Sequence, residues 1–442
     1  MKKYIYSVFI FFCTGFLYAQ EELNLSMQEA IDYAIENNYE NKIALNNVEA
    51  AKHKKWETTT IGLPQINGVV DYQNWLKQQV QLVDFNDDGI DEELIFTKKQ
   101  TAKASITLSQ LIFDGSYLVG LQSAKTYLKI SEQAKEKTVL ATREAIINAY
   151  GNVLVTEKTI AILKNNHKIL EKNLFETQKI YDNGLTELEN VQQLQITLGN
   201  VESNLRNALR LKEIAYQMLN ISLGNSIDVK LNLTSTLDNL VVNNTDLSLL
   251  ATQFKIDHHV DFKIAQNNRE SKRLLMKLEQ SKYLPSLSAF VNYGVTGFAD
   301  SFTFFDNEQR WLNSSLLGVS LNVPIFSSFG RNSKVQQAKI ALENADIRLE
   351  EAKQKLNLQV ETARSEYQLA IENYETAKKN LALAERIEKK QQIKFFEGIS
   401  SSFDLLQAQN QLYTQQNSYV QYMLNVIAKK AKLENALNIP LK

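Results

Sequence analysis

Cysteine is almost absent from this 442-residue chain. The single cysteine, Cys13, lies in an apolar run at residues 4–16 that follows Met1-Lys2-Lys3 and precedes Leu17-Tyr18-Ala19. A cationic start, an apolar stretch and a small residue are typical of a secretory signal peptide, so residues 1–19 are expected to be removed. The mature chain would then have no cysteine, which excludes disulfides and thiolate chemistry. A lipid anchor on Cys13 is disfavoured because bulky residues precede it.

The chain also lacks an excess of one charge and a long apolar run. Its 49 Lys and Arg nearly balance its 50 Asp and Glu, which argues against a nucleic-acid binder. After the signal peptide no apolar run approaches the roughly 18 to 20 residues of a membrane-spanning helix. If the protein crosses a membrane, it must use β-strands closed into a barrel, because these also satisfy the backbone in lipid.

Catalytic motifs are missing as well. The four histidines, His53, His167, His258 and His259, form no metal-ligand spacing, and no nucleophile elbow or phosphate loop occurs. We therefore expect a protein that is not an enzyme and has no catalytic residue.

Proline is scarce. Pro64, Pro285 and Pro324 stand beside candidate strands and Pro440 is near the end, so residues 65–284 and 325–439 contain none and leave room for very long helices. A helix over residues 333–396 would be about 96 Å long at 1.5 Å per residue. Gly398 interrupts it, and a second helix over residues 403–437 is expected to fold back as a hairpin.

Small and large apolar residues alternate along this predicted helix in steps of three and four, which is a coiled-coil seam rather than a generic amphipathic pattern. One extra step of four, from Leu356 to Val360, is a stutter. The seam predicts that Ala345→Leu would overpack while the same change at Ala341, off the seam, would be mild. The seam consists of Val335, Ala338, Leu342, Ala345, Leu349, Ala352, Leu356, Val360, Ala363, Tyr367, Ala370, Tyr374, Ala377, Leu381 and Ala384.

The chain repeats itself. A polar helical stretch leads into Leu-Pro and then into alternating residues at both Pro64 and Pro285, and a glycine turn follows later in each half, at Gly184 and Gly398. The first half should carry a helix over about 117–182 and a return to about 223. We therefore expect two repeats, residues 20–223 and 245–442, joined by a linker at 224–244.

Four stretches alternate apolar and polar residues, at about 65–74, 101–113, 286–297 and 312–326. Such alternation is typical of an outer-membrane barrel with a wet lumen. The alternative is a soluble sheet packed on one face, but the signal peptide and the aromatics expected near the far strand ends, Tyr72, Trp75, Tyr293 and Trp311, favour the barrel. Four strands cannot close a barrel. Two chains would give eight strands and a filled interior, whereas three would give twelve and an open lumen.

The order of these sequence features and their duplication resemble the pattern of the TolC-type outer-membrane efflux proteins. The matching motifs are Leu25-Ser26-Met27-Gln28-Glu29-Ala30-Ile31 with Asn37-Asn38, the paired Leu-Pro strand starts, Leu111-Ile112-Phe113-Asp114-Gly115, Gly184-Leu185 with Val191-Gln192, and Gly398-Ile399 with Phe403-Asp404-Leu405-Leu406-Gln407-Ala408-Gln409. The resemblance implies an α+β membrane protein with two repeats, each supplying two strands of a shared transmembrane β-barrel and long antiparallel coiled-coil helices that form a periplasmic tunnel. It also implies a homotrimer with a twelve-stranded barrel in outer-membrane lipid, docked by a periplasmic adaptor and an inner-membrane RND, ABC or MFS pump.

By this resemblance, Gly184, Leu185, Gly398 and Ile399 form the periplasmic tips where adaptors dock. The matching gate positions are Glu189, Asn190, Ser400, Asp404 and Gln407. Ser400 and Gln407 stand where an arginine and an aspartate occur in the best-known pattern, so the resemblance does not extend to ion pairs at these positions. The alternative for Asp404 and Glu189 is an ordinary solvated helix face.

One acidic loop offers a candidate metal site. Asp84, Asn86 and Asp88 are spaced like the opening of a calcium loop and precede Gly89. Position 12 is Ile95 rather than a bidentate glutamate, so the shorter candidate set ends at Glu92. The alternative, which the pattern favours, is an acidic extracellular hairpin tip with an Asp-Gly turn.

The sequence thus favours an outer-membrane exit duct of an efflux or type I secretion system, a passive conduit. A non-conducting periplasmic scaffold has no need for four alternating strands, and an adaptor subunit has no need for the duplicated plan.

Overall fold

The computed structural model describes residues 23–83, 89 and 92–439. The chain divides into two compact units. The helical unit consists of the described parts of Met1–Ala44, Glu136–His259 and Lys355–Lys442, and the sheet unit consists of the described parts of Leu45–Lys135 and Val260–Gln354. Each unit therefore takes segments from both predicted repeats, because the repeats divide the chain along its length and the units divide it in space. The predicted signal peptide lies outside the described residues.

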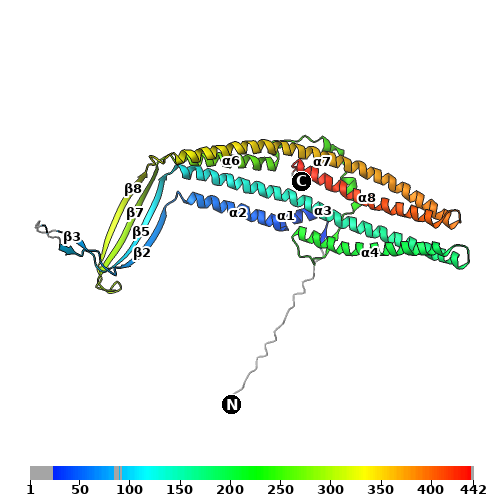
Figure 1. Cartoon of the computed structure of the whole chain (residues 1–442), viewed down its shortest axis with the longest axis horizontal. Coiled ribbons are helices and arrows are strands. Elements are labelled where there is room, and N and C mark those ends of the chain that lie inside the picture. Colours follow the sequence, from blue (N-terminus) through cyan, green and yellow to red (C-terminus); the bar gives the residue numbers. More distant parts are fainter. Residues whose placement is uncertain (1–22, 84–88, 90–91, 440–442) are drawn as a thin grey trace, which may run out of the picture. The chain divides into compact units, whose positions relative to one another are not determined.

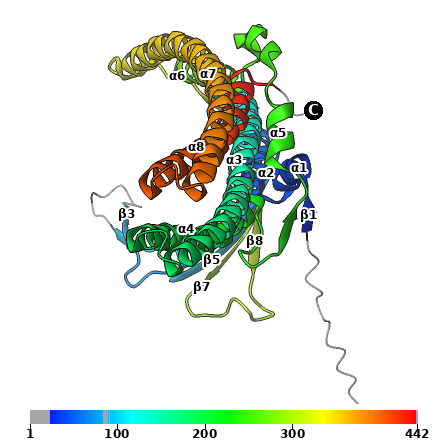
Figure 2. The same cartoon turned by 90° about the vertical axis from the view of Figure 1, so that its right-hand side faces the viewer.

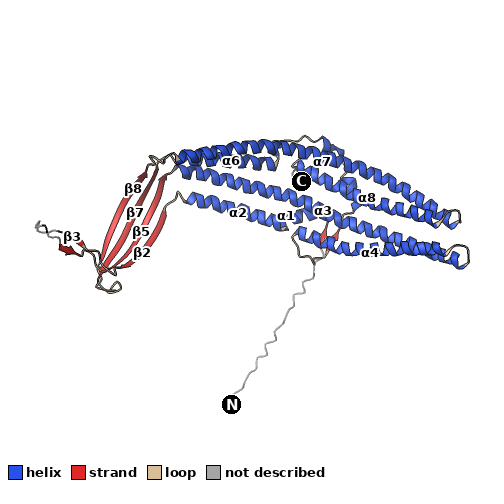
Figure 3. Ribbon diagram, viewed as in Figure 1, coloured by secondary structure: helices blue, strands red, loops and turns tan. Residues whose placement is uncertain are grey.

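Four antiparallel strands form the sheet of the sheet unit (Figure 3). They are β2 (Gln65–Asn74), β5 (Gln100–Phe113), β7 (Ser286–Ala299) and β8 (Trp311–Asn322), in the order β2-β5-β7-β8. The helix α6 (Val260–Ser281) leads into β7. A small extra ladder pairs β3 (Gln81–Val83) with β4 (Glu92–Leu94) between β2 and β5. We did not expect this ladder, because neither three-residue segment has a resolvable alternation.

The last strand ends earlier than predicted. β8 stops at Asn322 rather than at 326. Pro324 has no N–H to give to a ladder. Ser328 and Phe329 then adopt φ values of 46° and 63°, in the left-handed region, where a strand cannot continue.

The two faces of the sheet differ in character. On one face the register places Val70 beside Ala104, and Ala104 beside Val295. On the other face Asp71 lies opposite Lys103, and the Asn292 amide donates to the Thr107 hydroxyl at 2.7 Å. Alternation along each strand therefore separates an apolar face from a polar one.

Aromatic side chains gather at the loop end of the sheet. Phe304, in the β7–β8 loop, lies 5.9 Å from Tyr72 and 6.1 Å from Trp311, measured between ring centroids. Tyr293 was expected at a strand end, but it lies in the middle of β7 opposite Ile106 and Ser315. The correction follows from the length of β7, which continues to Ala299 rather than to 297.

Two very long helices contribute to both units. α3 (Gly115–Asp182) has 68 residues and α7 (Gly330–Phe396) has 67. α2 (Tyr39–Thr60) also belongs to both. In the helical unit, α3 lies beside α4 (Leu188–Leu223) and α7 beside α8 (Ser402–Ala436), as Figures 1 and 2 show. Every position of the seam predicted on α7 is buried or half-buried, which confirms the heptad assignment. No helix in the described part of the chain is both long enough and apolar enough to cross a membrane.

The core of the helical unit joins segments distant in the sequence. Tyr150 of α3, Tyr367 of α7 and Met423 of α8 are among its fully buried members. The hydroxyl of Tyr150 donates to the Leu25 carbonyl at 2.9 Å, and that of Tyr367 donates to the Asn244 carbonyl at 2.7 Å. The core therefore ties the two long helices to the segments before α1 and after α5.

Short elements complete this unit. β1 (Leu23–Leu25) pairs in parallel with β6 (Leu231–Leu233). α1 (Met27–Asn37) starts at the predicted capping box, in which Ser26 and Glu29 bond each other's backbone N–H groups. The expected linker 224–244 holds β6 and α5 (Leu237–Asn243), because the Leu231, Leu237 and Val241 side chains are buried in the core. Two 3₁₀ turns, η1 (Leu247–Ala251) and η2 (Ile256–His258), follow.

Candidate functional site

The candidate site consists of the two helical hairpin tips in the helical unit. In the first hairpin α3 ends at Asp182, and Gly184 follows with a φ of 71°. The Gly184 N–H donates to the Tyr181 carbonyl at 2.8 Å, and the Leu185 N–H donates to the Ile180 carbonyl at 3.1 Å. This pair of hydrogen bonds is a Schellman motif, which satisfies carbonyls that the helix end leaves open.

The second hairpin has the same geometry. Gly398 has a φ of 72°, its N–H donates to the Phe395 carbonyl at 3.1 Å, and the Ile399 N–H donates to the Lys394 carbonyl at 2.9 Å. A Cβ added at either Gly184 or Gly398 would meet no atom within 4 Å. The need for glycine therefore comes from the left-handed backbone and not from crowding.

Each tip exposes an apolar side chain just after its glycine. Leu185 is 78% exposed and Ile399 is 69% exposed. Phe403, in the first turn of α8, is also exposed. Both hairpins therefore carry an exposed apolar side chain directly after the glycine that reverses the chain.

Two of the five gate candidates belong to the start of α8. Ser401 caps α8 by accepting from the Asp404 N–H at 3.2 Å, and the Asp404 carboxylate accepts from the Ser401 N–H at 3.2 Å. The same carboxylate accepts from the hydroxyls of Ser401, at 2.7 Å, and Ser400, at 3.2 Å. The hydrogen bonds from Ser401 and then from Ser400 hold the pKa of Asp404 below its ordinary value. The structure thus gives Asp404 and Ser400 a local capping role.

Of the other three candidates, Glu189 and Gln407 are exposed and Asn190 is half-buried. Glu189 is exposed in the first turn of α4, where its charge is favoured by the positive end of the helix dipole. The Asn190 amide donates to the Thr186 hydroxyl at 2.7 Å, and Gln407 is exposed on α8. Among the described residues, no hydrogen bond or ion pair joins a gate candidate of one hairpin to one of the other.

Amide groups that we did not single out in the sequence join the two hairpins behind the tips. The Gln392 amide donates to the side-chain oxygen of the buried Asn173 at 2.9 Å, and the amide of the buried Asn166 donates to the side-chain oxygen of Gln416 at 2.8 Å. These bonds connect α3 to α7 and to α8. A signal was present, because Leu163, Asn166, Leu170, Asn173 and Thr177 follow heptad spacing with polar residues in the seam.

A carboxyl group lies in the same region. Burial raises the pKa of Glu388 on α7, and the nearby amide of the buried Gln409 on α8 partly opposes this effect. Burial, and then the charge of Glu388, raise the pKa of Tyr413. Behind the tips, amide side chains therefore join the two hairpins, whereas Glu388 lies within the second hairpin.

The predicted calcium set cannot be assembled from the described residues. Asp84, Asn86 and Asp88 lie outside them, whereas Glu92 begins β4. In the parts of the chain that the structure describes, no group of three or more His, Cys, Asp or Glu is placed to hold a metal ion.

The four-stranded antiparallel sheet and the two long helical hairpins give the chain a fold similar to that of membrane proteins of known structure. CusC matches with a TM-score of 0.75 and 14% identity over 93% of this chain and 91% of its own. VceC from Vibrio cholerae matches with a TM-score of 0.71 and 15% identity, covering 93% and 95%. The CmeC outer membrane channel of Campylobacter jejuni matches with a TM-score of 0.72 and 16% identity, covering 93% and 85%.

The family follows from the sequence. The sequence model of the outer membrane efflux protein family matches residues 30–225 and 256–438, which is most of the chain. The protein belongs to this family. A comparison with curated proteins gave no match.

Proposed function

We propose that this protein is the outer-membrane exit duct of a tripartite efflux or type I secretion system. It would act as a passive conduit in the outer membrane with helices extending into the periplasm, coupled through a periplasmic adaptor to an inner-membrane pump of the RND, ABC or MFS class. The four-stranded sheet with two open edges, in a chain of this family, is the observation that carries the proposal.

The open edges support a barrel shared between chains. Among the described strands β2 and β8 each have one unpaired side, and β2 is exposed along its whole length. An unpaired edge is a template for another strand. Because the chain supplies an even number of antiparallel strands, β8 of one copy can pair antiparallel with β2 of the next. Three copies would close twelve strands around an open lumen, whereas two would close a filled barrel.

The faces of the sheet support the same assignment. The face with Asp71, Lys103, Thr107 and Asn292 suits a wet lumen, and the face with Val70 and Val295 suits lipid. The aromatic cluster around Phe304 would then lie near the outer interface of the membrane. In this proposal each repeat, 20–223 and 245–442, supplies two strands and one hairpin.

The tips are the proposed contact with the adaptor. Gly184 and Gly398 set the reversals, and Leu185 and Ile399 are the exposed apolar groups that an adaptor would cover. Of the gate candidates, Glu189 and Gln407 have side chains available to neighbouring copies, whereas Asp404 and Ser400 would act by shaping the start of α8.

Bulky substitutions at the tips test this function. Gly398→Trp and Gly184→Trp should abolish export by strain and obstruction, while the trimer remains in the outer membrane. Gly199→Trp is the matched control, because Gly199 lies within α4 and an added Cβ there also meets no atom within 4 Å. Full export by the double variant Gly184→Trp/Gly398→Trp would contradict the assignment of the tips to the pump-facing end.

A further inference from the structure

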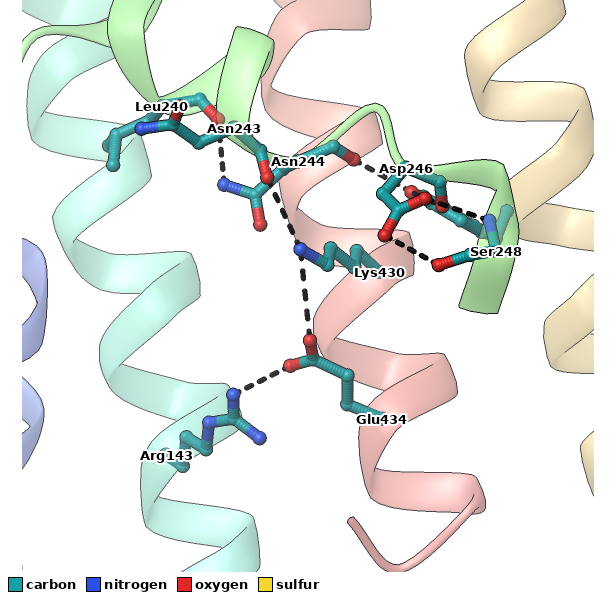
Figure 4. A network of polar contacts seen from close by, with 9 residues as sticks. Arg143, Leu240, Asn243, Asn244, Asp246, Ser248, Lys430 and Glu434 are labelled. Atoms are coloured by element: carbon teal, nitrogen blue, oxygen red, sulfur yellow. Dashed lines mark hydrogen bonds and ion pairs between the residues drawn. The ribbon is translucent and has the colours of Figure 1, made fainter. Parts of the chain in front are cut away.

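A cavity of about 330 Å³ opens in the helical unit, away from both tips. It lies between the start of α1, the middle of α3, the segment around α5 and the last turns of α8. Figure 4 shows Arg143 on α3 and Glu434 on α8 facing each other there, with Lys430 pointing toward the segment that carries Asn243. The volume falls at the lower end of the range for small-molecule sites.

The cavity has more positive than negative charge. Its charged lining residues are Arg143, Lys430 and Glu434, with side-chain exposures of 20%, 18% and 16%. The Arg143 guanidinium lies 2.7 Å from the Glu434 carboxylate, and the Lys430 ammonium lies 3.9 Å from the same group. One carboxylate therefore faces two cations in a partly desolvated place, where an additional anion is favoured.

A donor group is also left over. The Nε atom of Arg143 is buried and has no hydrogen-bond partner among the described residues. Lys430 has only a long second contact, 3.4 Å to the Asn243 carbonyl oxygen. The guanidinium has five N–H groups and binds carboxylates in a fork geometry, so one carboxylate partner does not exhaust it.

Nearby acids are already engaged. Asp246 accepts hydrogen bonds from the Ser248 N–H and hydroxyl at 2.8 and 2.6 Å. Glu29 accepts from the Ser26 N–H in the cap of α1. Both carboxylates therefore have hydrogen-bond donors of their own, and the charge of Asp246 also interacts with Lys430.

The rest of the lining combines the polar residues Ser26, Gln28, Ser235 and Asn244 with a group of apolar side chains. Met27, Ile31, Ile147, Leu240 and Ile427 contribute to the wall. A small inorganic anion would leave these side chains without a partner, whereas an organic acid would cover them while its carboxylate met the cations. We propose that this cavity binds a small organic carboxylate with an apolar body, held by Arg143 and Lys430.

An ion pair that only joins α3 to α8 is the competing explanation. Such a pair needs one cation for Glu434 and no open volume beside it. The two explanations predict different effects of Glu434→Gln on anion binding. Glu434→Gln removes the competing carboxylate and should strengthen anion binding, whereas a purely structural pair would only lose stability.

Binding of benzoate to the purified full-length protein in detergent tests the proposal by isothermal titration calorimetry at fixed ionic strength. Saturable binding of benzoate is expected, with at least tenfold weaker binding of neutral benzamide and of inorganic phosphate. Arg143→Met and Lys430→Met should each weaken benzoate binding about tenfold or more, and Glu434→Gln should tighten it. Lys158→Met is the control, because Lys158 on α3 pairs with Asp238 outside the cavity.

Different results would overturn the ligand class, the role of Arg143 and the site itself. Absence of saturable benzoate binding, or equal binding of benzoate and phosphate, would overturn the assignment to an organic carboxylate. Unchanged binding in a folded Arg143→Met protein, checked by its helical circular dichroism, would overturn the role of the cation. If Arg143→Met does not fold, Lys430→Met and Glu434→Gln still decide, and failure of both to shift the affinity would refute the site.

Discussion

Ala363→Leu is the sharpest test of the packed seam on α7. Ala363 is 0% exposed and belongs to the core cluster that includes Val360 and Tyr367 of the same helix and Met423 of α8. Leucine adds three carbons where no exposed surface remains. Overpacking of this kind typically costs about 1 to 3 kcal/mol. For domains of this general size, that corresponds to a fall of roughly 2 to 12 °C in melting temperature.

Thermal unfolding of the purified protein, followed by circular dichroism at the helical band, measures this change. Ala382→Leu is the matched control, because Ala382 lies on the same helix but is exposed. Exposed substitutions usually change the free energy of unfolding by no more than about 0.5 kcal/mol. Equal melting temperatures for Ala363→Leu and Ala382→Leu would refute the claim that the seam packs closely in this unit.

The structure changes the expectation for Ala345. The seam alone predicts overpacking by Ala345→Leu, but Ala345 is half-buried beside a cavity of about 270 Å³ in the sheet unit, lined also by Ala265 and Arg269. A leucine at position 345 has room to extend into this cavity. The melting temperature of the Ala345→Leu variant should therefore stay close to that of Ala382→Leu. The heptad spacing identifies which residues of α7 face neighbouring helices, but it does not show how much free volume lies beside each of them.

Three further outcomes follow from the tips and loops. Hydrogen bonds lower the pKa of Asp404, so its stabilisation of the start of α8 is present at neutral pH and lost as pH falls through that lowered pKa. Asp404→Asn should therefore speed amide hydrogen exchange of residues 401–405 at pH 7 but not below that pKa, and equal exchange at pH 7 would contradict the capping role. If Asp84, Asn86, Asp88 and Glu92 bind calcium, the ion should raise the melting temperature of the unaltered protein and not that of Asp88→Ala. If calcium does not change the melting temperature of the unaltered protein, the loop is an acidic turn that does not bind the ion. Epitope tags inserted at Asp88 and at Asp306 should be reached by antibody on intact cells, and tags hidden at both places would argue against extracellular loops.

Local patterns were informative where one residue type imposes the geometry. The glycines at 184 and 398 adopt the positive φ that a helix reversal requires, and the Ser26 capping box forms as its spacing predicts. β2 occupies Gln65–Asn74, the range expected from its alternation. In each case the deciding interactions lie within a few residues of chain, so the sequence pattern alone carries them.

Other features depend on distant segments. β6 has three residues and no periodic signal, and it forms because β1 pairs with it across more than 200 positions. Arg143 and Glu434 are also remote in sequence, so their ion pair and the cavity beside it have no local signature. The polar seam of α3 was readable in its spacing, but Asn166 and Asn173 broke the apolar pattern that defines a seam.

Electron cryomicroscopy of the purified protein in lipid nanodiscs would show whether several copies share one membrane barrel. We expect three copies around one axis, with the sheets inside the lipid disc and β8 of each copy paired antiparallel with β2 of the next. The apolar face that carries Val70 and Val295 should contact lipid, and the face that carries Asp71 and Lys103 should line the lumen. A particle whose sheets lie outside the lipid, or whose β2 and β8 edges remain unpaired between copies, would refute the shared barrel.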